Sequence, residues 1–276
     1  MQKVIYLKEI QKYSSYLDQG VIDYLNEDQT ETFESFKEFN IVAFDWYDID
    51  KINKDPSKIM IYIDRDDLFF ICENDEAFEI ASKYFEVKET NDTSLYYFFK
   101  NLFKGSTKYL EDFEDKISML DESIIKGKSE NTREKIIRLR SQVLRLKKYY
   151  EQFDFIFSEL TLNDNDVLSH DTLKYFRILK NRARRFITMV SNAKDYLTQV
   201  RESYQAQIDI EQNQIMKFFT VITTIFLPLT LIVGWYGMNL KMPEFEWDLG
   251  YLFVIVLCII VCLGWYFIFR KRKWFK

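Results

Sequence analysis

Two long uncharged segments near the end of the 276-residue chain constrain its fold more than any other feature. Residues 218–236 form a run of 19 residues without a charged side chain, and residues 249–269 form a second run of 21. An α-helix needs about 20 apolar residues to cross the hydrocarbon core of a bilayer. Two buried helices of a water-soluble domain would each show a polar face, which these runs lack. The sequence therefore predicts two transmembrane helices.

The charges that flank the two runs predict their orientation. Five basic residues follow the second run, whereas the connection 237–248 holds one lysine and three acidic residues. Basic residues collect on the cytoplasmic side of membrane helices, so we expect the connection outside and both termini in the cytoplasm. The first ten residues lack the apolar core of a signal peptide, which agrees with this orientation. We expect a multi-pass protein of the inner or plasma membrane, in contact with the lipid bilayer.

The remaining charges and the cysteines exclude several function classes. Residues 1–92 carry 22 acidic and 10 basic residues, and this acidic segment argues against a nucleic-acid partner because phosphate would be repelled. It suits cations or a basic partner instead. The three cysteines contain no C-x-x-C pair, which excludes a disulfide framework and a thiolate zinc site. Nothing resembles a catalytic triad, a phosphate loop or a paired-carboxylate site, so we predict no enzyme.

Short runs of β-branched and aromatic residues predict a small α/β domain over residues 1–92. The expected strands are 4–7, 40–46, 59–63 and 68–72. The last two flank the turn Asp64-Arg65-Asp66-Asp67, where Asp64, Asp66 and Asp67 could hold a regulatory divalent cation. Turns are commonly rich in aspartate, so an ordinary solvated turn is the simpler interpretation.

From about residue 93 the apolar residues repeat at the helical spacing of three and four. We expect one helix over 95–124 and a second, antiparallel helix over 136–160, with a polar loop between them. The segment NDND at 163–166 offers N-cap residues for a third helix. This third helix is expected to run unbroken into the first apolar run, because no glycine or proline interrupts 166–227. Its apolar heptad indicates packing against the two preceding helices and against copies of itself.

These elements together predict an α+β membrane protein of three parts. The parts are an N-terminal cytoplasmic α/β domain at 1–92, a helical stalk at 93–214, and two transmembrane helices with a basic tail at 215–276.

A second face of the third helix is small and polar in the stalk and keeps threonines and glycines in the apolar run. One row, at a spacing of seven, carries Asn181, Thr188, Asp195, Glu202, Asp209, Met216, Thr223, Thr230 and Gly237, and the adjoining row carries Asn192, Gln199, Ala206, Asn213, Thr220, Leu227 and Gly234. An exposed polar stripe would explain the stalk part alone. Threonines that face lipid gain nothing, whereas at a helix interface or in a wet pore their hydroxyls would be satisfied. Because the stripe continues through the apolar run, we interpret it as the axis of a pore.

The first apolar run ends in Tyr236-Gly237-Met238-Asn239, and Met242-Pro243-Glu244 follows after two residues. The stretch 216–244 resembles the CorA family of magnesium and divalent-cation transporters. The hallmark of that family is Gly-Met-Asn at the end of the first of two C-terminal transmembrane helices, with Met-Pro-Glu in the outer loop. The lysine-rich tail is similar as well. The resemblance is one of motifs over 213–276 and one of layout over the rest of the chain.

The resemblance implies a homopentamer whose five first transmembrane helices surround an ion pore. Asn239 would place a ring of uncharged amide oxygens at the outer mouth, which can hydrogen-bond hydrated Mg²⁺ without stripping its water. Glu244 would lie in the outer loop. The implied pore lining, from the mouth to the cytoplasm, is Gly234, Thr230, Leu227, Thr223, Phe219, Met216 and Asn213, followed by the funnel residues Asp209 and Glu202. The implied activity is import of Mg²⁺, with Co²⁺ or Ni²⁺ as further ions, gated by cytosolic Mg²⁺.

Two alternatives keep the same layout. One is a zinc transporter of the related ZntB-like branch, which typically varies the middle residue of the tripeptide, so Met238 favours the magnesium side. The other is a non-conducting membrane-anchored cation sensor, against which the polar stripe through the apolar run counts. One departure from the family is Leu240-Lys241, which stands where many members carry an acid.

Overall fold

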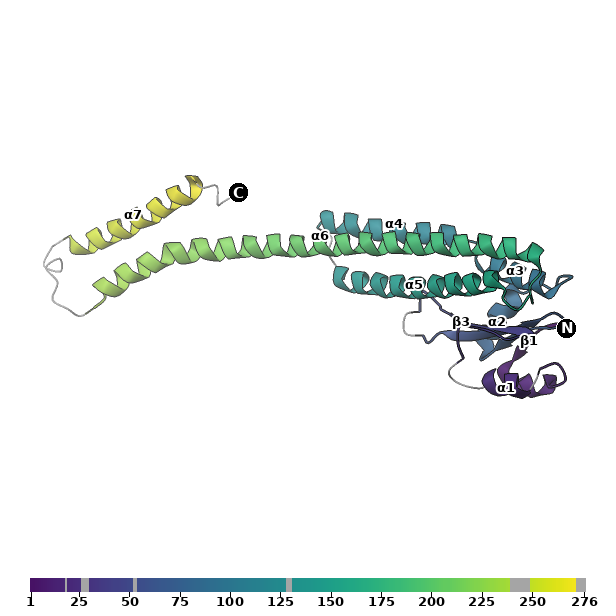
Figure 1. The fold of residues 1–276 in the computed structure, drawn as a ribbon. Coiled ribbons are helices and arrows are strands. Elements are labelled where there is room, and N and C mark those ends of the chain that lie inside the picture. The colour runs from purple at the N-terminus through teal and green to yellow at the C-terminus, as the bar shows by residue number, and fades with distance from the viewer. Residues whose placement is uncertain (18, 26–29, 52–53, 128–130, 239–248, 272–276) are drawn as a thin grey trace. The chain divides into compact units, whose positions relative to one another are not determined.

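The structure is a computed structural model that describes the chain except for residues 18, 26–29, 52–53, 128–130, 239–248 and 272–276 (Figure 1). The chain forms two compact units, Met1–Glu202 and Ser203–Lys276. The first unit holds a β-sheet with helices on both of its faces. The second holds the C-terminal part of the long third helix, with its apolar run, and the apolar C-terminal helix. The predicted division at residues 92 and 214 stays a prediction.

The sheet of the first unit is mixed. Its strand order is β1 (Gln2–Tyr6), β5 (Leu68–Cys72), β4 (Ser57–Asp64), β3 (Phe39–Trp46) and β2 (Phe33–Ser35). β1 runs parallel to β5, and the other neighbours are antiparallel. The predicted strands at 40–46, 59–63 and 68–72 are confirmed, as is the hairpin between the last two. The first strand begins two residues earlier than predicted, and the three-residue β2 was not predicted.

Both faces of the sheet are buried. Successive residues of a strand point to opposite faces, so each strand contributes side chains to both sides. On one side, Ile41 and Ala43 of β3 pack against the 3₁₀ helix η1 (Leu7–Tyr13) and α1 (Gln19–Leu25). On the other side, Phe44 of β3 lies 5.1 Å, between ring centroids, from Phe153 of α5 (Thr132–Leu162). Phe70 of β5 lies 4.5 Å from Phe98 of α3 (Asn91–Leu102). α2 (Asp75–Tyr84) follows β5 and begins at Asn74, whose side chain accepts a hydrogen bond from the Ala77 N–H.

The predicted helix over 95–124 is wrong in one respect, because the chain breaks between α3 and α4 (Ser106–Ile125). Gly105 lies in the left-handed region at φ +86°, a conformation that favours glycine and turns the chain. Phe103 remains buried at the break and packs edge-on against Phe153 and Phe186. The apolar spacing continues across the break, so periodicity alone did not reveal it.

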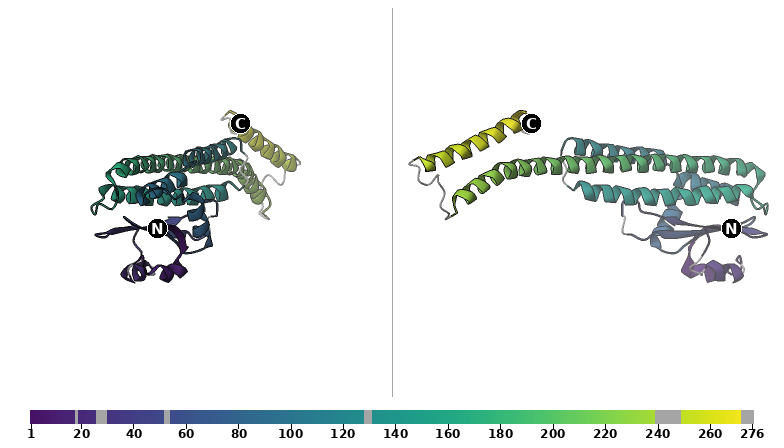
Figure 2. Two further views of the ribbon diagram at one scale, coloured as in Figure 1. Left: turned by 90° about the vertical axis from the view of Figure 1, so that its right-hand side faces the viewer. Right: turned by 60° about the vertical axis from the view of Figure 1, so that its left-hand side comes forward.

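The long third helix, α6 (His170–Tyr236), is one continuous helix of 67 residues. Within the first unit, α4, α5 and α6 lie side by side, as Figures 1 and 2 show. The prediction that 163–166 caps α6 is wrong. Asn163 instead ends α5 in the left-handed region at φ 49°, and its side chain is bonded to the backbone of Leu168. α6 begins only after Ser169.

The heptad of α6 is buried from Phe176 to Val200, which confirms the predicted packing against the preceding helices. Further along, Ile215 of the same heptad is 56% exposed. α6 and α7 (Gly250–Lys271) are long and apolar enough to cross a membrane, and none of the residues in the most apolar window of α6 is buried. The predicted architecture, an N-terminal α/β domain with a long helix and a C-terminal apolar helix, is confirmed.

Candidate functional site

The candidate pore face lies on α6 between Asn213 and Met238. The residues predicted to line a pore are all exposed in the single chain, namely Asn213, Met216, Phe219, Thr223, Leu227, Thr230 and Gly234. Thr223, Leu227, Thr230 and Gly234 also line one cavity of 750 Å³ along this helix, together with the apolar side chains of Ile222, Phe226, Leu231, Trp235 and Met238. The helical spacing therefore brings these four residues to one hollow face, as the alternation of three and four predicts.

The threonine hydroxyls on this segment are arranged alike. Those of Thr220, Thr223 and Thr230, on the candidate pore face, and of Thr224, outside it, each donate a hydrogen bond to the backbone carbonyl four residues earlier, at 2.7, 2.9, 2.8 and 2.7 Å. A hydroxyl carries one hydrogen, so its remaining hydrogen-bonding capacity is that of an acceptor. The helix thus presents oxygen lone pairs on its exposed face, which suit a cation or the hydrogens of its hydration water.

Pro228 lies inside α6 and does not end it. Proline has no N–H, so the carbonyl of Thr224 receives no helical hydrogen bond from this position. In a membrane helix such a loss is tolerated where neighbouring helices, side chains or water satisfy the carbonyl.

The end of α6 is tight at Gly237. Its N–H donates to the Val233 carbonyl at 2.8 Å, and the N–H of Met238 donates to the Trp235 carbonyl at 3.3 Å. A Cβ atom added at Gly237 would lie 2.8 Å from the Val233 carbonyl oxygen, closer than side chains tolerate, whereas one added at Gly234 would meet nothing within 4 Å. Tyr236 is half-buried beside them. Asn239, the predicted selectivity residue, and Glu244, predicted in the outer loop, lie outside the described residues.

The predicted funnel residues are exposed acids on α6. Glu202 is exposed at the end of the first unit, and Asp209 is exposed in the second. The Asp209 carboxylate accepts a hydrogen bond from the Gln205 side-chain amide at 3.0 Å. Their role as a cation funnel stays a prediction.

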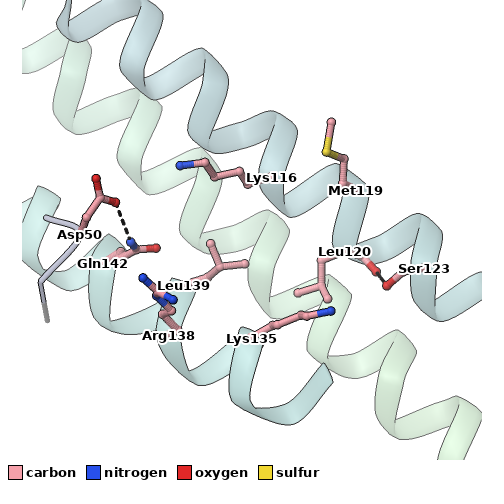
Figure 3. Close-up of a pocket in the computed structure, with 9 residues that line it drawn as sticks. All are labelled: Asp50, Lys116, Met119, Leu120, Ser123, Lys135, Arg138, Leu139 and Gln142. Atoms are coloured by element: carbon pink, nitrogen blue, oxygen red, sulfur yellow. Dashed lines mark hydrogen bonds between the residues drawn. The ribbon is translucent and has the colours of Figure 1, made fainter. Parts of the chain in front are cut away.

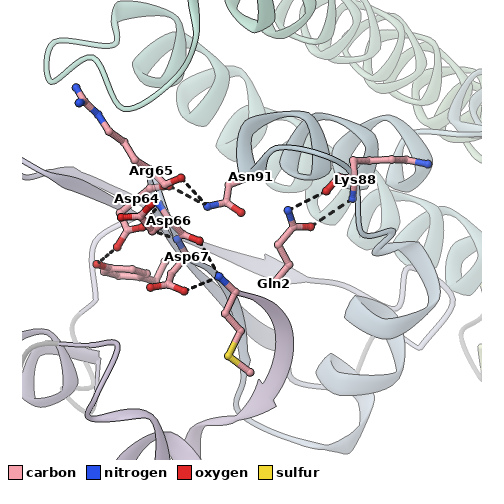
Figure 4. A network of polar contacts seen from close by, with 9 residues as sticks. Gln2, Asp64, Arg65, Asp66, Asp67, Lys88 and Asn91 are labelled. Atoms are coloured by element: carbon pink, nitrogen blue, oxygen red, sulfur yellow. Dashed lines mark hydrogen bonds and ion pairs between the residues drawn. The ribbon is translucent and has the colours of Figure 1, made fainter.

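The predicted cation turn at 64–67 is held by its own hydrogen bonds (Figure 4). The Asp64 carboxylate accepts from the backbone N–H groups of Asp66 and Asp67 and from the Tyr62 hydroxyl. The Asp67 carboxylate pairs with the amino group of Met1 at 2.6 Å. Burial and the bond to Asp64 raise the pKa of Tyr62 above its usual value.

Two of the three predicted ligands, Asp64 and Asp67, therefore already have partners, Asp64 in the turn itself and at Tyr62, and Asp67 at the amino group of Met1. Across the described ranges, no group of three or more His, Cys, Asp or Glu side chains is placed to hold a metal ion. The regulatory role of Asp64, Asp66 and Asp67 stays a prediction that a single chain does not test.

One residue that the sequence did not single out fixes the start of α6. Asp92 of α3 is only 7% exposed, and its carboxylate accepts hydrogen bonds from the backbone N–H and the hydroxyl of Ser169, the residue before α6. It also accepts from the Thr90 hydroxyl and the Thr93 N–H. Burial alone would raise the pKa of Asp92, but these hydrogen bonds lower it below its usual value. In the sequence, Asp92 looks like an ordinary acid in the first turn of a helix.

Comparisons with known proteins agree with this layout. A family model described as CorA-like Mg²⁺ transporter protein matches residues 8–271. The cobalt/magnesium transport protein CorA of Thermotoga maritima is 28% identical over 188 residues, which cover 68% of this chain and 54% of that protein. The chain thus spans about half the length of this curated relative.

Two solved structures share the fold. The CorA magnesium transporter from Methanocaldococcus jannaschii matches 99% of this chain and 90% of its own, with a TM-score of 0.80 and 20% sequence identity. The ZntB cytoplasmic domain from Vibrio parahaemolyticus matches 75% of this chain and 87% of its own, with a TM-score of 0.61 and 11% identity. At these identities the likeness concerns the fold alone, so it does not choose between magnesium and zinc.

Proposed function

Because the chain belongs to the CorA-like Mg²⁺ transporter family, we propose that it conducts divalent cations, Mg²⁺ foremost, across a membrane along the exposed face of α6. The observation that carries this proposal is the cavity along α6 that Thr223, Leu227, Thr230 and Gly234 line within an apolar helix. Lipid tails donate no hydrogen bonds to the threonine oxygens, whereas water and hydrated cations bind to such oxygen acceptors.

The assembly that closes the pore is a ring of identical chains, five in number by the family resemblance. Ile215, Phe218 and Phe219 are each more than half exposed in one chain, and apolar surface of this extent needs lipid or partner helices to cover it. The heptad of α6 supplies a matching face on each copy. The residues on the polar face then converge on the axis of the ring.

Selection takes place at the outer mouth, where Asn239 of each chain contributes its amide. Mg²⁺ gives up its hydration water reluctantly, so a ring of neutral carbonyl oxygens that binds the hydrated ion admits it at low energetic cost. Gly237 suits this position because its lack of a Cβ lets the chain leave α6 close to the Val233 carbonyl. Further in, Leu227 and Met216 form an apolar neck that can close by dewetting.

The driving force is the membrane potential. A divalent ion gains about 4.6 kcal/mol per 100 mV of inside-negative potential, so inward flow needs no coupled reaction. Both termini lie in the cytoplasm, and Asp209 and Glu202 receive the ion there. The family resemblance also implies regulation by the transported ion. In this proposal, cytosolic Mg²⁺ bound by acidic residues of the N-terminal domain at 1–92 holds the pore closed.

The test is divalent-cation flux into liposomes that contain the purified full chain. Wild-type protein is expected to admit Mg²⁺ when an inside-negative potential is imposed, and Asn239→Ala is expected to lose most of this flux. Gln214→Ala, an exposed amide on α6 before the apolar run, is the matched control and should keep it.

Three outcomes contradict the proposal or one of its parts. Equal Mg²⁺ flux for wild type and Asn239→Ala would reject the role of Asn239, and zinc flux without magnesium flux would favour a ZntB-like transporter. The absence of current with any divalent cation would favour a non-conducting sensor.

A further inference from the structure

A basic pocket lies between α4 and α5, near the ends of these helices that the 126–131 connection joins (Figure 3). Its volume is 390 Å³, and it is called the α4–α5 pocket below. Lys116 of α4 and Lys135 and Arg138 of α5 supply its cations. The buried side chains of Leu120 and Leu139 form an apolar wall beside them.

The side chains of the three cations of this pocket are unpaired within the part of the chain that the structure describes. Among the residues that the structure describes, the side chains of Lys116, Lys135 and Arg138 take part in no ion pair and no hydrogen bond. Neighbouring cations are engaged: Lys51 pairs with Asp48 at 3.2 Å, and Lys54 pairs with Glu76 at 2.8 Å. The α4–α5 pocket therefore brings together three cationic side chains that have no ion-pair partner among the described residues.

The acid of this pocket offsets only part of that charge. Asp50 lines the α4–α5 pocket, and its carboxylate accepts a hydrogen bond from the Gln142 side-chain amide at 3.3 Å. The lining side chains thus carry three positive charges and one negative charge. A multivalent anion would be attracted here.

The position of these cations on α5 opposes the stability of the helix itself. α5 begins at Thr132, and residues 132–148 contain seven basic residues and one acidic residue, Glu134. The N-terminal end of a helix carries a partial positive charge that acts within its first turn, so a cation there, such as Lys135, destabilises the helix and an anion stabilises it. A sequence that breaks this local rule calls for a compensating interaction.

We propose that the α4–α5 pocket binds a phosphate-bearing anion. The Arg138 guanidinium can form two parallel hydrogen bonds with phosphate oxygens, and Lys135 and Lys116 add point charges from both helices. The apolar wall of Leu120 and Leu139 accommodates the organic part of such a ligand. The ligand is either a soluble phosphate compound or the headgroup of an anionic phospholipid. The inference does not depend on ion transport.

The test for a soluble ligand is titration calorimetry with inorganic pyrophosphate on the full chain in uncharged detergent. Mg²⁺ is left out of the buffer because it chelates pyrophosphate. The double variant Lys135→Gln/Arg138→Gln is expected to bind at least about tenfold more weakly than wild type, because each charge-assisted hydrogen bond contributes about this factor. The matched control is Arg133→Gln/Arg140→Gln, which removes two exposed charges of the same helix that do not line the pocket and should stay within about twofold.

The test for a lipid headgroup compares hydrogen exchange in nanodiscs of phosphatidylglycerol and of phosphatidylcholine. Phosphatidylglycerol is expected to slow exchange in peptides covering 116–123 and 135–142 in wild type and in the control pair, but not in the pocket variant. Specific binding in either arm supports the proposal and identifies the source of the phosphate. The proposal is overturned if neither pyrophosphate nor phosphatidylglycerol binds, or if the control pair loses as much as the pocket variant.

Discussion

The buried carboxylate of Asp92 gives the sharpest stability prediction, because it links α3 to the start of the helix that carries the candidate pore. Asp92→Asn keeps the size of the side chain but replaces one acceptor oxygen with a donor. One carboxylate oxygen accepts from the Ser169 N–H and hydroxyl, and the other accepts from the Thr90 hydroxyl and the Thr93 N–H. In Asp92→Asn one of these two oxygens is replaced by an NH₂ group, so one pair of donors loses its acceptor. A buried N–H left without an acceptor costs about 2 kcal/mol.

In a unit the size of Met1–Glu202, a loss of about 2 kcal/mol lowers the Tm by roughly 4–8 °C. The assay is thermal unfolding of the purified full chain followed by circular dichroism at one fixed scan rate, since unfolding of such a protein need not be reversible. Hydrogen exchange in peptides covering the first turns of α6 should become faster in the variant.

The matched control is Asp171→Asn, which removes the same charge from an exposed side chain two residues after Ser169. The Asp171 side chain is 97% exposed and pairs with Lys174 at 3.5 Å, so the loss of this exposed charge in the first turn of α6 should lower the Tm by less than half as much as Asp92→Asn does. If Asp92→Asn were as stable as Asp171→Asn, the anchoring role of Asp92 would be refuted.

The pH dependence of thermal stability tests the role of Asp92 in a second way. Hydrogen bonds lower the pKa of folded Asp92, so its stabilising contribution is complete above the ordinary carboxyl pKa of about 4. The contribution is lost as the pH falls through the lowered pKa of the folded state. Wild type should therefore lose its advantage over Asp92→Asn under acid conditions, and a constant Tm difference down to pH 2 would contradict the assignment.

Two further substitutions test the end of α6 and the support of the sheet. Gly237→Ala brings a Cβ to 2.8 Å from the Val233 carbonyl oxygen and should reduce Mg²⁺ flux at least about tenfold. The control is Gly234→Ala, whose added Cβ meets no atom within 4 Å and which should alter the flux less. Equal effects of the two variants on Mg²⁺ flux would contradict this reasoning. The Arg145 guanidinium donates to three backbone carbonyls of the β3–β4 connection, which one ammonium cannot replace. Arg145→Lys should lower the Tm by roughly 2–6 °C in thermal scans, and Arg140→Lys, with an exposed side chain, should not.

The sequence predicted the elements whose signals are local. The strands at 40–46, 59–63 and 68–72 carry β-branched and aromatic runs, and the heptad up to Val200 is buried as expected. The break at Gly105 was missed because the buried apolar spacing continues across it. The start of α6 was placed too early because Asn163 can cap either helix end, and only its bonds to Leu168 show which end it caps.

The candidate site was predictable only in part, for a physical reason. Helical spacing alone places Thr223, Thr230 and Gly234 on one face, so the structure had to agree with the sequence there. The contacts of Asp92 with Ser169 join residues 77 positions apart, and no local pattern encodes them. The engagement of Asp64 and Asp67 by neighbouring groups likewise depends on the folded turn and on Met1.

The central claim, that one face of α6 lines a water-filled path, is tested most directly by cysteine accessibility. Cys72, Cys258 and Cys262 are first replaced by serine or alanine, and single cysteines are then placed at Thr230 and at Thr224, which lies about 120° of helix rotation away. A charged, membrane-impermeant thiol reagent added to liposomes is expected to modify Thr230→Cys and block Mg²⁺ flux, and to leave Thr224→Cys unmodified. Equal modification of both positions, or none at Thr230→Cys in a conducting protein, would contradict the account.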